Sequence, residues 1–152
     1  MKLLKIQERV ADALKGIDAL HGVPVVVEDK GDVKARLDAA VAQAKRCLLV
    51  QTPGLRVTSA ASKVMVGIAT VVVQAIEKLA VGRGDDAHHT AQDMAEIAAW
   101  KLNLMPCDGV GTLVAKEISS EILGDSSLSY ALRLEVQTTL GDPLDKGKEE
   151  AV

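Results

Sequence analysis

Aromatic side chains are almost absent from this sequence: among its 152 residues there is no phenylalanine, one tryptophan (Trp100) and one tyrosine (Tyr130). Proteins that hold single-stranded nucleic acid stack the bases on aromatic rings. The formal net charge of −3 also supplies no positive field for phosphates. Both absences disfavour sequence-specific recognition of nucleic acid. The core must therefore be built from Val, Leu, Ile, Ala and Met side chains.

Catalytic motifs are lacking as well. None of the serines stands in a G-x-S-x-G turn, and Gly109 and Gly111 precede an expected strand without a P-loop lysine. Glu117 and Glu121 share one strand face, but paired carboxylates on a hairpin are more often the solvated side of a sheet than an acid–base pair. Nucleophilic catalysis therefore has no support in the sequence.

Metal-ligating residue types gather in one glycine-rich segment, where Asp85 and Asp86 are followed by His88 and His89. Adjacent histidines usually point in different directions, and no further histidine or cysteine lies nearby in the sequence. We therefore expect an exposed loop that contacts a neighbouring subunit, and no metal site.

The two cysteines, Cys47 and Cys107, stand in apolar surroundings without C-x-x-C spacing, which predicts buried free thiols. A disulfide between them stays open at this level. The N-terminal residues lack the apolar run of a signal peptide. The longest uncharged run, between Lys63 and Glu77, is shorter than the roughly 18 apolar residues of a membrane span. Folding in a reducing cytoplasm, away from membranes, is expected.

Apolar residues at three- and four-residue steps predict three helices. The first runs from about residue 2 to residue 20, and the second follows Asp32, which can cap it. The third runs from Thr90 to Met105, and Thr90 with Asp93 resembles a capping box. The helix faces carry Leu3, Ile6, Val10, Leu14 and Ile17; Val33, Leu37 and Val41; and Met94, Ile97, Ala98, Lys101, Leu102 and Met105.

The β-branched run Val25-Val26-Val27-Glu28 predicts a short strand. The apolar run Cys47-Leu48-Leu49-Val50, ended by Thr52-Pro53-Gly54, predicts a second strand. Residues 64–76 are ambiguous, because a helix would also align their apolar side chains. β-branched residues crowd this segment and lose side-chain freedom in a helix. We therefore expect a strand buried on both faces, with a bulge or bend at Gly67. Residues 54–63 would then form a hairpin excursion between two antiparallel strands.

The end of the chain carries the clearest pattern, a hairpin of residues 112–123 and 128–140 across a Gly124-Asp125-Ser126 turn. Its last strand alternates apolar and polar residues, and only Thr138 breaks the period of two. The apolar positions are Leu128, Tyr130, Leu132, Leu134, Val136 and Leu140.

The expected element order is α-β-α-β-β-α-β-β, without internal repeats. Hairpins outnumber parallel crossovers in this order. That favours an α+β fold, with a mainly antiparallel sheet of four to five strands and two to three helices packed on one face. We expect residues 1–140 to form a single domain and the charged residues 141–152 to form a flexible C-terminal tail.

This pattern resembles the tail-terminator (tail-completion) proteins of long-tailed bacteriophages. The likeness covers about residues 3–140. It rests on the N-terminal amphipathic helix, the strand led by Pro24, the long strand 64–76, the helix from Thr90 to Met105 and the closing hairpin. The resemblance implies a small α+β subunit that is not an enzyme and needs no cofactor. Such subunits assemble into a hexameric ring that ends polymerisation of the tail tube.

The resemblance also implies the partners: copies of the chain itself, the tail tube protein and the head–tail connector protein. The protein would reside in the host bacterial cytoplasm during assembly and then in the virion tail. Two other classes stay open. One is another phage tail or neck component, such as a tube or connector protein, and the other is a bacterial ligand-binding or regulatory α+β domain.

A ring needs heterologous contacts, and exposed polar loops or sheet edges are natural suppliers of them. The candidate subunit or tail-tube contacts are Arg56 and Lys63 in the 54–63 segment, and Arg83, Asp85 and Asp86 in the 82–89 loop. Trp100 lies slightly off its helix stripe, so packing at the stripe edge and anchoring of an interface are both open.

Overall fold

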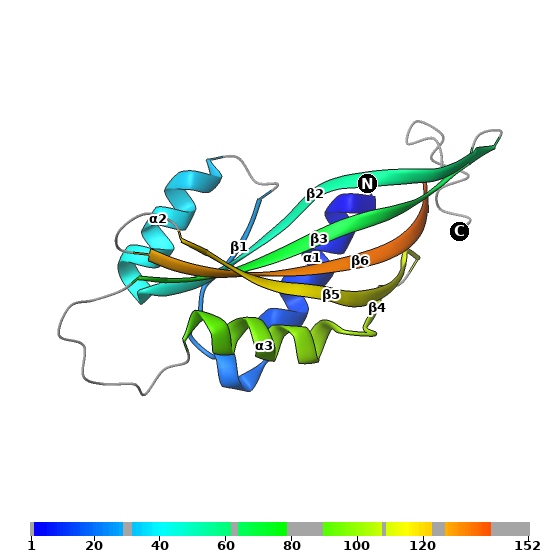
Figure 1. Cartoon of the computed structure of the whole chain (residues 1–152). Coiled ribbons are helices and arrows are strands. Elements are labelled where there is room, and N and C mark those ends of the chain that lie inside the picture. Colours follow the sequence, from blue (N-terminus) through cyan, green and yellow to red (C-terminus); the bar gives the residue numbers. More distant parts are fainter. Residues whose placement is uncertain are drawn as a thin grey trace.

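The structure is a computed structural model that describes residues 2–28, 32–61, 64–78, 90–107, 109–122 and 127–140. These residues combine helices with a curved sheet, which confirms the expected α+β class (Figure 1). The elements are α1 (Lys2–Lys15), a 3-10 turn (Asp18–Leu20), β1 (Val25–Val27), α2 (Val33–Ala44), β2 (Arg46–Ala61), β3 (Val64–Lys78), α3 (Ala91–Leu102), β4 (Pro106–Cys107), β5 (Gly111–Ile122) and β6 (Ser127–Leu140).

Within the described residues the sheet has six strands in the order β1-β2-β3-β6-β5-β4. β1 runs parallel to β2, and the other neighbouring strands are antiparallel. The prediction of four to five antiparallel strands was therefore only roughly right. β4 has two residues, too few to show a period. The β1-α2-β2 unit is a parallel crossover, and its three-residue first strand has no signal that distinguishes it from a hairpin strand.

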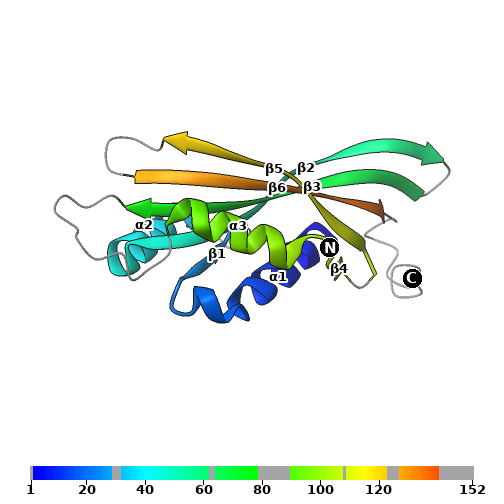
Figure 2. The same cartoon turned by 60° about the horizontal axis from the view of Figure 1, so that its bottom comes forward.

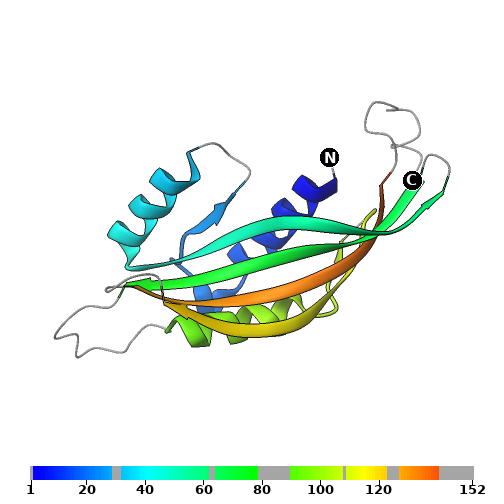
Figure 3. The same cartoon turned by 45° about the horizontal axis from the view of Figure 1, so that its top comes forward.

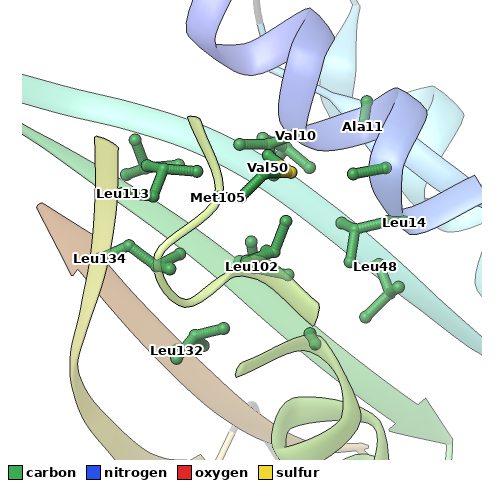
Figure 4. Packing of buried hydrophobic residues seen from close by; sticks show 14 of the residues in the cluster. Val10, Ala11, Leu14, Leu48, Val50, Leu102, Met105, Leu113, Leu132 and Leu134 are labelled. Carbon is green, nitrogen blue, oxygen red and sulfur yellow. The ribbon is translucent and has the colours of Figure 1, made fainter. Parts of the chain in front are cut away.

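α1 and α3 lie together under one face of the sheet, and the main core lies between the two layers (Figure 2). Figure 4 shows side chains of both helices directed at those of the strands. The shortage of aromatics predicted an aliphatic core, and the core is aliphatic. Its fully buried members include Ile6, Val10, Leu14, Leu48, Val50, Val71, Met94, Leu102, Leu113, Leu132 and Leu134.

α2 packs on the opposite face of the sheet, so the expectation that the helices share one face was wrong (Figure 1). The reason lies in the start of β2, where Leu48 and Val50 face α1 and α3 while Cys47 and Leu49 face α2. A continuous apolar run is what a strand covered on both faces requires. The second cluster contains Val26, Ala40, Cys47, Leu49 and Ile76, with Val33, Leu37 and Val41 packed against it.

β2 is much longer than predicted, and residues 54–61 are not an excursion. The strand continues past Pro53 because a register shift between Gln51 and Gly54 absorbs the proline. A second shift lies between Val57 and Ser59, opposite Gly67 of β3. The bulge expected at Gly67 is therefore on the partner strand.

β3 is a strand, as predicted, but it is not buried on both faces along its length. Half-buried and buried residues alternate from Val66 to Gln74, and only Ala75, Ile76 and Glu77 are buried in succession. β6 forms the expected hairpin with β5. Thr138, expected to break the alternation, is buried in line with Val136 and is 2% exposed.

The helix ends follow the sequence signals in part. Thr90 caps α3, and both bonds of the capping box with Asp93 are present at 3.2 Å. Asp32 stands at the N-cap of α2, as predicted, but it has a left-handed backbone and makes no side-chain capping bond. α1 ends at Lys15, before the predicted residue 20.

Candidate functional site

The β2–β3 hairpin projects beyond the helices as an arm, defined here as residues 56–61 and 64–68 (Figure 3). Val57, Val64 and Met65 are between 41% and 49% exposed on this arm. Arg56 is also exposed, and it pairs in register with Ile68 on the sheet face opposite α1 and α3. The arm therefore presents exposed valine and methionine side chains beside one cation.

Gly67 fixes where the arm joins the core. A Cβ atom at this position would lie 2.8 Å from the Arg56 carbonyl oxygen and 2.9 Å from Cδ2 of Leu55. Leu55 itself packs against the main core. Only a residue without a side chain lets β2 approach β3 this closely, and the bulge in β2 lies directly alongside.

A second exposed apolar surface lies at the C-terminal end of α3, where Trp100 is 89% and Leu104 is 66% exposed. The sequence left two roles open for Trp100, packing at the edge of the helix stripe and anchoring of an interface. Its exposure favours the interface anchor. Leu104 has a left-handed backbone (φ 63°), and its N–H donates to the Leu113 carbonyl at 2.8 Å. An open groove of about 370 Å³ lies beside Leu104, and its lining includes the polar residues Arg9, Asp12, Lys101 and Asn103.

The part of the sheet face opposite α1 and α3 that α2 leaves uncovered is called here the open face. It carries a shallow hollow of about 340 Å³, lined by Ile68, Thr112, Val114, Lys116, Glu135 and Gln137. Beside it Arg133 contacts Glu135 at 2.9 Å and Glu117 at 3.6 Å. The Arg133 cation stands between the two carboxylates, so the expected reading of Glu117 as solvated sheet surface fits this geometry.

Glu77 is a buried carboxylate that no pattern in the sequence indicates. It is 2% exposed, and its Oε1 accepts a hydrogen bond from the Ala91 N–H at 3.2 Å. That N–H belongs to the first turn of α3, where helix N–H groups have no partner within the helix. Glu77 thus ties the end of β3 to the start of α3 and acts as a structural residue.

Among the predicted contact residues, only Arg56 lies in the described part of the chain. Lys63, Arg83, Asp85 and Asp86 lie outside it, as do His88 and His89. The exposed side chains Val57, Val64, Met65 and Leu104 were missed, because apolar residues near predicted element ends are usually assigned to the core.

Both cysteines are buried thiols that form no disulfide, as predicted. Burial raises the pKa of the Cys47 thiol from 9.0 to about 12, so it stays protonated and unreactive at neutral pH. In the described ranges no group of three or more metal-ligating side chains occurs. None of the helices found there has the length and apolar character needed to cross a bilayer.

Comparisons with known proteins give no family. No protein-family model matches the chain, and no curated protein matches it. Among the solved structures 19 chains match. One of them, a protein without a descriptive name, is 15% identical with a TM-score of 0.47, over 93% of this chain and 95% of its own. No function follows from that likeness.

Proposed function

We propose that this protein is a structural subunit that assembles with copies of itself into a ring. The ring would cap the tail tube of a long-tailed bacteriophage, end its polymerisation and form the joint to the head connector. The order and lengths of the elements are the basis for choosing a tail terminator among ring-forming proteins.

The observation that carries the proposal is that apolar side chains are exposed on two unrelated elements. Val57, Val64 and Met65 lie on the arm, whereas Trp100 and Leu104 lie on and after α3. Single exposed apolar residues are normal, but a tryptophan with 89% exposure is the type of side chain that anchors protein interfaces. Two dissimilar surfaces suit heterologous contacts, which form a ring when the rotation between neighbouring copies closes.

The proposed partners are further copies of the chain, most simply six in one ring, the tail tube protein and the head–tail connector. Assembly would take place in the host cytoplasm before the ring becomes part of the virion tail. In this role the protein is not an enzyme and uses no cofactor. Its surfaces, and not a reactive group, carry the function.

A ligand-binding domain is the less favoured reading. The hollow on the open face has a volume within the range of small-molecule sites. However, it is a shallow depression on a strand surface, and the carboxylates Glu117 and Glu135 are already paired with Arg133. Ligand sites bury most of the ligand surface in a concave, largely apolar pocket.

The test is a measurement of mass in solution on the purified chain over a range of concentrations, followed by electron microscopy. Closed rings of a fixed subunit number are the expected result. Long tubes would instead favour a tube protein. A monomer at every concentration, with purified tail tubes left uncapped after mixing, would overturn the proposal.

A further inference from the structure

The two outer strands of the sheet cover their neighbours only in part. β1 pairs with Leu48–Val50 of β2. The last hydrogen bond between this segment and β2 runs from the Glu28 N–H to the Val50 carbonyl, at 3.0 Å. On the other side β4 pairs with Gly111 and Thr112 of β5. Asn103 extends this cover by accepting a bond from the Ala115 N–H at 2.9 Å.

Two stretches of strand edge therefore have no strand beside them within the described residues: 52–61 of β2 and 117–122 of β5. Open edges invite pairing with another chain, and proteins that stay monomeric protect them with lysines, prolines or covering segments. On the β2 stretch Pro53 protects only the beginning, and Arg56 is the one charged residue.

The register places these edges at opposite ends of the sheet. Glu117 is level with Arg133, Arg133 with Val72, and Val72 with Gln51. In the same way Ile122 is level, through β6 and β3, with Arg46. The open edge of β5 thus lies level with the part of β2 that β1 covers, and the open edge of β2 lies at the far end.

We propose that the open edge of β5 in one copy pairs with the open edge of β2 in the next copy, so that the sheet continues from subunit to subunit. The proposal rests on the proposed ring and names its contact. From β2 through β3 and β6 to β5 each step is antiparallel. β5 therefore runs opposite to β2. When the next copy is moved within the plane of the sheet without rotation, its β2 lies beside β5 of the first copy as an antiparallel pair.

The diagonal placement also sets the geometry of the ring. The next copy must shift along the strands by about eight residues, or about 26 Å at 3.3 Å per residue, and sideways by four strand spacings, about 19 Å. This shift carries β1 and β4 past the ends of the neighbouring sheet. The strands then run obliquely to the ring axis, as strands do in closed barrels.

Charge supports the same pairing. Residues 52–61 carry one positive charge, Arg56, whereas residues 117–122 carry two negative charges, Glu117 and Glu121. By register Arg56 and Glu117 both belong to the open face, so in a continuous sheet they project from the same side. Opposite charges on neighbouring strands stabilise the pair, and like charges destabilise it.

The experiment uses the full chain with single cysteines introduced at exposed open-face positions, Ser59→Cys and Ser119→Cys, and a short bismaleimide. Cys47 and Cys107 are buried and give a low background. Co-expressed Ser59→Cys and Ser119→Cys chains should give a covalent dimer, because a heterologous contact joins one edge of each kind. Each variant alone should give none. Gln137→Cys, on the central strand β6, is the control that should not cross-link with Ser59→Cys.

The outcomes separate this contact from the ring itself. Rings that form without the mixed cross-link would overturn the edge pairing and leave the proposed function standing. Cross-linking of Ser59→Cys with itself would show an isologous contact and also overturn it. Chains that stay monomeric and never cap tail tubes would remove both proposals.

Discussion

The centre of the sheet and the arm are built from the same strands but have different surroundings. Near Leu48 and Cys47 β2 is covered on both faces, by α1 and α3 on one side and α2 on the other. Near Val57 and Ser59 the same strand is exposed. Folding free energy comes from the covered part, because burial of apolar surface is its main source. The arm adds little to folding, so its apolar residues are available for contacts with other chains.

The strongest test of this contrast is Leu134→Ala in the covered part. Leu134 is fully buried on β6 within the main core. The substitution should lower the free energy of unfolding by about 2–5 kcal/mol, because it removes apolar contacts and leaves a cavity. Urea unfolding followed by circular dichroism measures the change. Val57→Ala on the arm is the control, and an equal loss there would contradict the division into two regions.

The junction of arm and core is tested by Gly67→Ala. The new Cβ would press on the Arg56 carbonyl and on Leu55, and such overpacking costs about 1–3 kcal/mol. Gly54→Ala on the neighbouring strand is the matched control, since nothing lies within 4 Å of its added Cβ. If thermal unfolding shows the two variants equally stable, the close approach at Gly67 is wrong.

The α2 side of the centre is tested by raising the pH. Cys47 has a folded pKa of about 12 against 9.0 in the unfolded chain. Above pH 9 the unfolded chain loses the thiol proton while the folded chain keeps it, so stability should fall as the pH rises from 9 toward 12. Cys47→Ala should remove this part of the pH dependence. Identical slopes in the two proteins would show that the thiol is not desolvated.

The smallest effect on folding is expected at the exposed helix surface, with Trp100→Ser. Trp100 is 89% exposed, so the free energy of unfolding should change by no more than about 0.5 kcal/mol. Assembly measured by mass in solution should nevertheless weaken, because an interface anchor is lost. Lys101→Ser, at the next exposed position of the helix, is the control. Unchanged assembly would show that Trp100 is not part of the interface.

Local signals in the sequence predicted the local structure well. The alternation in residues 128–140 gave β6, and Thr90 with Asp93 gave the start of α3. The failures concern partners distant in sequence. Residues Cys47–Val50 are apolar on both faces, so both faces of the sheet must be covered there. The pattern does not say which helix covers which face, and the side on which α2 lies was therefore missed. The length of β2 was missed because Pro53 normally ends a central strand, whereas here it lies on an edge.

The candidate site was less predictable than the fold. Arg56 was chosen for its charge in a presumed loop, and it lies on a strand. The arm residues Val57 and Met65 have no sequence signal of exposure, because exposure depends on where the helices end relative to the strands. Only the assembled layers show that the β2–β3 hairpin extends beyond the helices that cover the sheet.

β2 is one uninterrupted element from Arg46 to Ala61, laddered to β3 along its length apart from two register shifts. A force on the tip of β2, directed along the strand, therefore loads many of its hydrogen bonds to β3 at once, including those at the helix-covered end. Bonds loaded together resist separation far better than bonds opened one after another. In an assembly joined through the arm, a load on one subunit would therefore pass into the helix-covered part of its sheet.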